Sequence, residues 1–199
     1  VKYGLIAGIW AGIFLFFLVL WYAKDLDKIT EKADFKQKTS ITFLDRNGDI
    51  ITRYGGLQGE QVAVFDLPAH TIHAILAVED RKFYRHHGVD PFGIMRAMVV
   101  NILNGRTVQG GSTLTQQLAK NLFLSNERSI KRKVQELLLA LWLEDKFTKD
   151  EILTAYINRV YFGSGAYGID AAAMVYFNKS ATRLSLEESA LIAGLLKAP

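Results

Sequence analysis

Residues 3–23 form an unbroken stretch without a charged side chain, and this stretch limits what the start of the chain can fold into. A helix rises about 1.5 Å per residue, so these roughly 21 residues would span about 30 Å, the hydrocarbon core of a bilayer. Trp21 and Tyr22 lie at its end, where aromatic rings favour the membrane interface. A cleaved signal peptide would have a shorter apolar region and a small-residue cleavage site. The pattern therefore predicts a transmembrane anchor over residues 3–23, followed by a mixed-charge linker over 24–39.

The composition excludes several classes of protein. Half of the 199 residues are hydrophobic, which is incompatible with a disordered chain. Cysteine is absent from the sequence, so disulfides, thiolate metal sites and cysteine nucleophiles are excluded. The net charge is +4, and no basic run alternates with aromatic residues as in a nucleic-acid groove. This mild basic excess fits a partner that carries phosphates, such as lipid headgroups or a diphosphate, and predicts no nucleic-acid partner.

After the linker, the pattern predicts a small β hairpin and then helices. Short apolar runs at 40–44 and 50–54 flank Asn47 and Gly48, a pair that is typical of hairpin turns. A third strand is expected at 61–65. Beyond Pro68 the pattern is helical. The sequence therefore predicts one mainly α domain over residues 40–199, with a small N-terminal β hairpin.

Several of the expected helices begin at recognisable capping residues. An N-cap side chain accepts a hydrogen bond from a free N–H of the first turn, and a Glu three residues later can return the interaction. The expected starts and helices are Asp90 before Pro91 with a helix to 103, residues 110–112 opening a helix over 113–122, Asn126 with a helix over 127–146, Thr148 and Glu151 with a helix to 157, and Ser185 and Glu188 with a helix to 196.

Two polar segments are candidates for chemistry near the start of the domain. Glu79 and Asp80 end an apolar run, where a half-buried carboxylate could serve as a base. A solvated helix end is the alternative. Residues 109–121 place two glycines and several hydroxyl groups at a helix start, where backbone N–H groups can bind an anion. They lack the order of a nucleotide P-loop, and an ordinary Ser-capped helix is the alternative.

Two more segments follow. Arg128, Arg132 and Glu136 are spaced four apart and share one helical face, before an apolar stretch over 137–143 that we expect to be buried. An exposed Arg–Glu ion pair is the alternative reading of this segment. Residues 156–173 combine glycines with aromatic residues and predict a tight irregular loop with a structural role. The histidines at 70, 73, 86 and 87 lack a ligand pattern that would indicate a zinc site.

Taken together, the four segments resemble the glycosyltransferase module of class A penicillin-binding proteins and of monofunctional peptidoglycan glycosyltransferases, the family 51 glycosyltransferases. The matching residues are Glu79, Asp80, Phe83, His86 and Gly88 in the first motif, Gly110, Ser112, Thr113, Thr115, Gln116 and Gln117 in the second, with Lys120 and Asn121 following, and Arg132, Lys133 and Glu136 in the third. The fourth motif lies within 151–168, and the resemblance covers residues 40–199. The sequence has no Ser-x-x-Lys motif, so it does not carry the transpeptidase chemistry of bifunctional relatives. It stops before the family's last short segment, and we expect the domain to continue further.

The resemblance implies a lysozyme-like fold with two lobes, one of which dips into the membrane surface. It implies that lipid II, a disaccharide-peptide on a polyprenyl diphosphate, is polymerised into a β-1,4-linked glycan with inversion at the anomeric carbon. Glu79 would be the catalytic base, with Lys120 and Arg128 neutralising the diphosphate. Glu136 would be the second acid, which either holds a divalent metal such as Mg²⁺ or Mn²⁺ or orients the cations. The other substrate- or diphosphate-binding residues carried over from the family are Asp80, Phe83, His86, Ser112, Thr113, Thr115, Gln116, Gln117, Asn121, Arg132 and Lys133.

The implied partners are lipid II, the growing glycan strand, the bilayer and other proteins of cell-wall synthesis. The implied location is the bacterial cytoplasmic membrane, with one transmembrane pass and the catalytic domain outside. This orientation comes from the resemblance, because the flanking charges do not determine it. Two alternatives remain, a lysozyme-like peptidoglycan hydrolase and a non-catalytic membrane scaffold for cell-wall synthesis. The cations favour the transferase, because glycan cleavage releases no diphosphate.

Overall fold

The structure is a computed structural model that describes residues 10, 41–47, 50–54, 57–106, 108, 110–124, 127 and 129–197. The predicted linker, and the predicted anchor apart from Trp10, lie outside these residues. Among the residues that are described, no helix has both the length and the apolar character needed to cross a bilayer.

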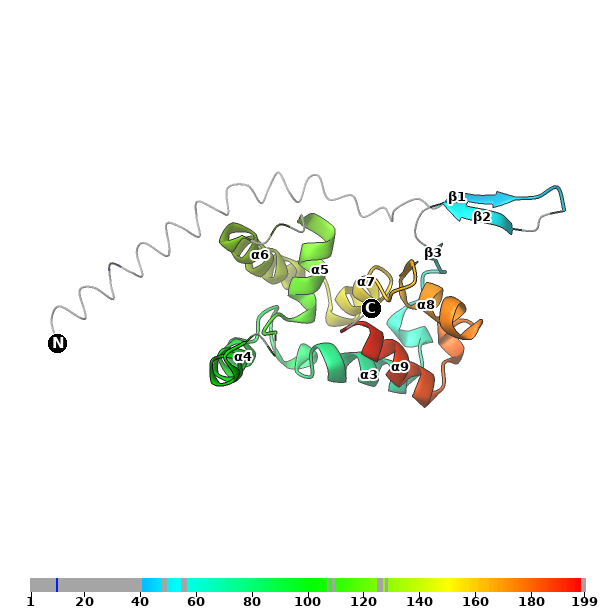
Figure 1. Cartoon of the computed structure of the whole chain (residues 1–199). Helices are drawn as coiled ribbons and strands as arrows, with labels where there is room; N and C mark the ends of the chain where they lie inside the picture. Colours follow the sequence, from blue (N-terminus) through cyan, green and yellow to red (C-terminus); the bar gives the residue numbers. More distant parts are fainter. Residues whose placement is uncertain are drawn as a thin grey trace.

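The described part of the chain is mainly helical, as predicted (Figure 1). The α-helices are α3 (Ala69–Glu79), α4 (Pro91–Asn104), α5 (Leu114–Phe123), α6 (Ile130–Lys146), α7 (Lys149–Ile157), α8 (Ile169–Phe177) and α9 (Leu186–Leu195). The strands are β1 (Ile41–Leu44), β2 (Ile50–Tyr54), β3 (Leu57–Gln58) and β4 (Ala166–Tyr167). Three short 3-10 helices are η1 (Val64–Asp66), η2 (Phe83–Arg85) and η3 (Ala181–Arg183).

The strands form two small ribbons. β1 and β2 pair antiparallel, with Ile41 opposite Tyr54, and they project away from the helices (Figure 1). Residues 48 and 49, in the segment that joins these two strands, lie outside the described residues. β3 pairs in parallel with β4, which comes from the loop before α8. None of the predicted site residues lies in either ribbon.

The third strand predicted at residues 61–65 is wrong. This segment lies along α7, and its last two residues begin η1. The N–H of Val62 donates to Asn158 Oδ1 at 3.0 Å, and the N–H of Val64 donates to Thr154 Oγ1 at 3.2 Å. Side chains of α7 and of its C-cap residue therefore satisfy the backbone groups that a neighbouring strand would otherwise have paired.

Most of the predicted helix starts are confirmed, and one is wrong. Thr148 with Glu151 and Ser185 with Glu188 form reciprocal capping boxes at α7 and α9. The helix predicted over 127–146 begins at Ile130 instead. Ser129 is its N-cap and accepts a hydrogen bond from the N–H of Arg132 at 3.1 Å. Asn126, the predicted cap, lies outside the described residues.

The core gathers around α5, which lies between α6 and α7, while α3 packs against α9. Leu114, Leu118 and Ala119 of α5 are fully buried. They meet large buried side chains from the neighbouring elements, including Leu139, Leu153, Tyr156, Phe162 and Ile169. Burial of this apolar surface is the main stabilising term for the fold, and it holds the first turn of α5 in a fixed place.

Helix α4 lies apart from the other labelled helices in Figure 1 and is apolar on its exposed face. Phe92 is 75% exposed and Leu103 is 80% exposed, with Met95, Met98, Val99 and Ile102 between them also exposed. An exposed apolar patch of this kind marks a site for a membrane, a ligand or another protein. The prediction that residues 137–143 are buried all round is wrong at Leu141, whose exposed fraction is 37%.

Candidate active site

Glu79 is the last residue of α3, and its half-buried carboxylate is held from α5. Gln117 Nε2 donates a hydrogen bond to Glu79 Oε2 at 2.6 Å. Behind it, the hydroxyl of Tyr156 donates to Gln117 Oε1 at 3.3 Å. Burial, and to a smaller extent the charge of Glu79, raise the pKa of the Tyr156 hydroxyl above its ordinary value, so it keeps its proton. Glu79 thus has a fixed donor on one oxygen and is otherwise free to act as a proton acceptor.

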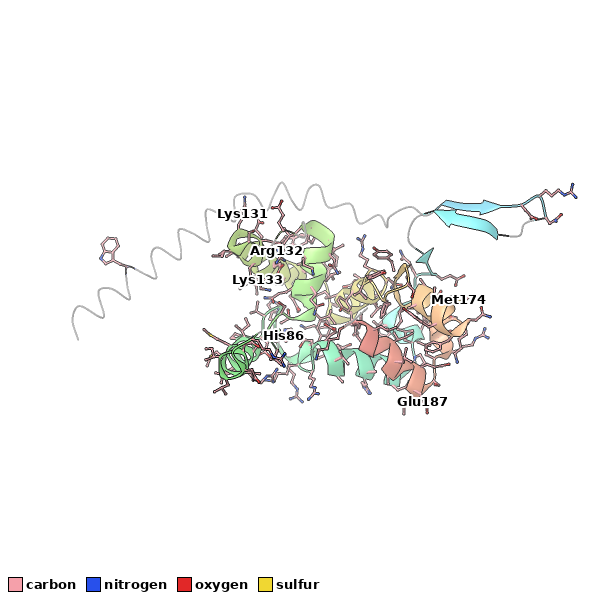
Figure 2. All side chains as sticks on the ribbon, viewed as in Figure 1. His86, Lys131, Arg132, Lys133, Met174 and Glu187 are labelled. Carbon is pink, nitrogen blue, oxygen red and sulfur yellow. The ribbon has the colours of Figure 1, made fainter. Side chains whose placement is uncertain are left out.

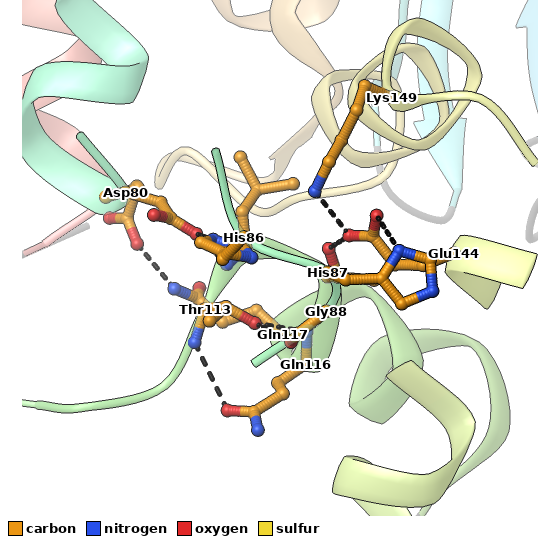
Figure 3. Close-up of polar contacts among 12 residues, drawn as sticks. Asp80, His86, His87, Gly88, Thr113, Gln116, Gln117, Glu144 and Lys149 are labelled. Carbon is orange, nitrogen blue, oxygen red and sulfur yellow. Dashed lines mark hydrogen bonds and ion pairs between the residues drawn. The ribbon is translucent and has the colours of Figure 1, made fainter. Parts of the chain in front are cut away.

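Asp80, the next residue, has a different environment and joins two elements (Figure 3). Its Oδ2 accepts hydrogen bonds from His86 Nε2 at 2.8 Å and from the N–H of Leu114 at 3.0 Å. The Asp80 and His86 side chains are only 6% and 8% exposed. Asp80 therefore ties the end of α3 to the first turn of α5, and this fixes the distance between Glu79 and Gln117.

Thr113 makes a second link between the first two motifs. It is the N-cap of α5 and exchanges hydrogen bonds with Gln116 in a capping box. Its hydroxyl also donates to the carbonyl of Gly88 at 2.6 Å. Gly88 has a φ of +74°, and a Cβ there would lie 2.9 Å from the carbonyl oxygen of Ala140 in α6. Only glycine allows this close approach, which packs the first motif against α6.

A buried polar cluster lies between α5, α6 and α7 (Figure 3). Glu144 Oε1 accepts from Thr115 Oγ1 at 2.6 Å and from Lys149 Nζ at 2.7 Å. Lys149 also lies 4.5 Å from the centre of the buried Phe83 ring. The Glu144 side chain is 2% exposed, and these donors satisfy a carboxylate that would be costly to bury without partners. The cluster holds Thr115 and Phe83 within the packed interior of the domain.

Two cations converge on Glu136 near the start of α6, where Figure 2 labels Arg132 and Lys133. Arg132 Nη1 pairs with one carboxylate oxygen of Glu136, and Lys133 Nζ pairs with the other at 2.8 Å. Lys133 Nζ also donates to Ser112 Oγ at 2.6 Å. We call Ser112, Arg132, Lys133 and Glu136 the cation cluster. Glu136 is 4% exposed, so this is a buried ion pair and not the exposed one that was the alternative reading.

The electrostatics of the cation cluster favour an anion. Burial, and then the charges of Arg132 and Lys120, lower the pKa of the Lys133 ammonium below its ordinary value. Arg132 Nε is buried and lacks a hydrogen-bond partner in the described part of the chain. An anion near Ser112 would offset the repulsion among the cations and offer acceptors to their N–H groups.

A groove of about 780 Å³ opens beside the cation cluster, between α4, Ser112 and α6. We call it the α4 groove. Its apolar lining includes Ile94, Ala97, Met98, Ile102 and Leu137, and its polar lining includes Ser112, Gln116 and Lys133. This arrangement suits a molecule with an anionic group and a long apolar part.

The family model described as "Transglycosylase" matches residues 47–199, which is most of the chain. This chain belongs to the transglycosylase family. The proteins named penicillin-binding protein 1A from Aquifex aeolicus (strain VF5), Escherichia coli (strain K12) and Pseudomonas aeruginosa (strain PAO1) are 43%, 45% and 43% identical to it. The matches cover 98%, 87% and 90% of this chain but 27%, 20% and 22% of those relatives. The transglycosylase sequence thus spans about a quarter of the length of the relatives it matches.

Most of the predicted site residues of this transglycosylase fall into three groups. Glu79 and Gln117 are in direct contact, and Ser112, Arg132, Lys133 and Glu136 form the cation cluster. Lys120 is partly buried and is close enough to the cation cluster to act on Lys133 electrostatically, while Asn121 is exposed on α5. The buried supporting group consists of Asp80, Phe83, His86, Thr113, Thr115 and Gln116. Arg128 lies outside the described residues.

The buried supporting group holds the motifs of the transglycosylase together. Its members hydrogen-bond or pack with other protein groups, so their predicted contact with substrate stays a prediction. Three further residues, Glu144, Lys149 and Tyr156, were not among the predicted site residues. Glu144 and Lys149 lie outside the four motifs and on different helices, so no helical spacing links them to the motifs. Tyr156 lies within the fourth motif, to which the sequence assigned a structural role.

Proposed function

We propose that this chain polymerises the glycan strands of peptidoglycan from lipid II, releasing a polyprenyl diphosphate. The observation that carries this proposal is the cation cluster at the edge of the apolar α4 groove. A lipid diphosphate has the same two parts, an anionic group and a long apolar chain. Glu79 lies near the same segment, because Gln117 contacts Glu79 while the adjacent Gln116 lines the groove.

The chemistry follows from these placements. The acceptor sugar hydroxyl attacks the anomeric carbon of the donor, and Glu79 takes its proton as the new C–O bond forms. The bond from the anomeric carbon to the diphosphate breaks, and the electron pair leaves with the diphosphate. Lys133, Lys120 and the Arg132 side chain oppose the growing negative charge, a role we extend to Arg128 by family resemblance. Direct displacement inverts the anomeric configuration, so an α-linked diphosphate becomes a β-1,4-linked glycan.

We further propose that the exposed face of α4 enters the membrane surface as one lobe of a lysozyme-like fold. Phe92, Met95 and Leu103 are more than half exposed, and lipid would remove this apolar area from water. Substrate and product are both tethered to a bilayer, so a domain on the outer face of the bacterial cytoplasmic membrane would find both. The growing glycan strand is the second partner, and other proteins of cell-wall synthesis are possible further partners.

A divalent metal remains part of the proposal. Among the described residues no three His, Cys, Asp or Glu side chains are grouped to hold a metal ion. Mg²⁺ is commonly bound by one or two carboxylates with phosphates and water, and a carboxylate oxygen that accepts one hydrogen bond keeps a second lone pair. Glu136 therefore fits as a single protein ligand to Mg²⁺ or Mn²⁺. The bound ion would add positive charge beside the diphosphate.

The test is incubation of the 199-residue chain with labelled lipid II, with and without divalent metal, followed by separation of the products by length. We expect glycan strands and free polyprenyl diphosphate. Soluble fragments from purified glycan, with lipid II left intact, would support the hydrolase instead. Binding of lipid II without turnover would support the non-catalytic scaffold.

Lys133 gives the proposed diphosphate site a pH dependence. Its pKa is lowered by burial and by neighbouring cations, so in the free protein its charge is lost at lower pH than in an ordinary lysine. A bound diphosphate stabilises the charged form, so the complex holds more protons in this range and affinity falls as pH rises. We expect binding of polyprenyl diphosphate to weaken as the pH rises, at lower pH than the titration of an ordinary lysine would give. Lys133→Arg, which stays charged, should flatten this dependence. Equal slopes for the two proteins in a titration series would contradict the prediction.

A further inference from the structure

Tyr156 lies directly behind the residue that holds Glu79. It is on α7, its ring is 1% exposed, and its hydroxyl donates to Gln117 Oε1 at 3.3 Å. The other end of the same amide donates from Nε2 to Glu79 Oε2 at 2.6 Å. Three side chains from α7, α5 and α3 thus form one hydrogen-bonded chain that ends on the proposed base.

We infer that Tyr156 is a positioning residue, which fixes the Gln117 amide so that its N–H group faces Glu79. This inference rests on the proposed function, because it assigns Glu79 the role of base. An ionised carboxylate only accepts hydrogen bonds, and a Gln side chain has a donor end and an acceptor end. With the Tyr156 proton directed at Oε1, the donor end of Gln117 is left for Glu79. Turning the amide over would bring Oε1 against the carboxylate, two acceptors in contact.

Both ends of this chain are held by the fold. The first turn of α5 is fixed by the box between Thr113 and Gln116 and by the Asp80 contact to the N–H of Leu114. α7 is fixed by its own capping box at Thr148 and by the contacts of Thr154 and Asn158 with residues 62–64. The Tyr156 hydroxyl therefore reaches Gln117 without rearrangement of the backbone, and the orientation of the amide is set before substrate arrives.

The predicted consequence concerns the ionised form of Glu79. A donor on the carboxylate favours the charged state, and an acceptor in its place favours the protonated state. Without the Tyr156 hydroxyl, Gln117 is free to present either end to Glu79. The carboxylate would then lose its fixed donor in part of the molecules, and the acid limb of the pH–rate profile would move to higher pH. Tyr156 does not touch substrate in this arrangement, so KM should stay the same.

The test uses Tyr156→Phe, which removes the hydroxyl and keeps the ring. We expect kcat on the acid limb to fall by about threefold to tenfold, equivalent to a shift of about half to one pH unit, with KM unchanged. Tyr176→Phe is the matched control. It removes a hydroxyl that donates to the carbonyl of Phe162 at 3.0 Å in another part of the fold, and the pH profile should not move.

A second variant tests the same inference in case Tyr156→Phe fails to fold. Gln117→Met removes the middle of the chain and should shift the acid limb in the same direction. If Tyr156 acts only through Gln117, adding Tyr156→Phe to Gln117→Met should cause no further shift. An unchanged profile in Tyr156→Phe, or a further shift in the double variant, would overturn the inference while wild-type polymerisation stands. Wild-type protein that does not polymerise lipid II would overturn the proposed function itself, and the inference with it.

Discussion

We expect Glu79→Gln to reduce polymerisation of lipid II by about 10²- to 10⁴-fold, the usual contribution of a general base. Glutamine has nearly the volume of glutamate, and its Oε1 can still accept the hydrogen bond from Gln117 Nε2. The substitution therefore removes proton acceptance and leaves the packing at the end of α3 in place. KM should change little, because the base acts on the acceptor hydroxyl in the transition state.

The measurement is the initial rate of glycan formation under saturating lipid II, together with the thermal unfolding midpoint. Glu60→Gln is the matched control, because it makes the same chemical change at an exposed glutamate before α3. It should retain the wild-type rate. Undiminished polymerisation by Glu79→Gln would assign the proton transfer to another group. A large drop in the unfolding midpoint of Glu79→Gln would instead show that the rate falls because the protein is destabilised.

Helix starts that depend on residues within one turn of each other could be predicted from the sequence. A capping box needs a hydroxyl and a carboxylate three residues apart, so Thr148 with Glu151 and Ser185 with Glu188 fixed the starts of α7 and α9. The start of α6 was harder, because Asn126 and Ser129 are both competent N-caps by residue type. Ser129 is the cap in the structure, and the local pattern has no information to choose between them.

Contacts between segments that are far apart in the chain could not be predicted from the sequence. The run at 61–65 contains valines and a phenylalanine, which favour strands, but its N–H groups pair with Thr154 and Asn158 from about 90 residues further along. Glu144 is paired with Lys149 across a helix boundary, where no helical period relates the two. Tyr156 lies in the fourth motif, to which the sequence assigned a structural role. Its contact with Gln117 exists because α5 and α7 pack together, and that packing is a property of the whole core.

We expect Glu136→Gln to lower both stability and activity, because Glu136 is the shared counter-ion of two cations. Its side chain is 4% exposed and that of Arg132 is 18% exposed, so removing the charge leaves Arg132 largely buried without a carboxylate. Breaking a buried pair in this way costs about 3 kcal/mol of unfolding free energy. Arg132 and Lys133 would also lose their fixed directions beside Ser112. We expect kcat/KM to fall on the order of 10²-fold.

A second variant separates the two effects. Replacing the pair by apolar side chains, Arg132→Met with Glu136→Leu, should recover most of the stability measured by urea unfolding, because a buried ion pair is often replaceable by packing. Activity should stay low, since the diphosphate site has lost the Arg132 cation and the carboxylate that positions Lys133. Raised Mg²⁺ then distinguishes the two roles of Glu136. Partial rescue of Glu136→Gln by Mg²⁺ indicates a metal ligand, and no rescue at any concentration indicates a carboxylate that orients the cations. Wild-type stability and activity in Glu136→Gln would remove the cation cluster from the proposed mechanism, because the placement of Arg132 and Lys133 depends on that carboxylate.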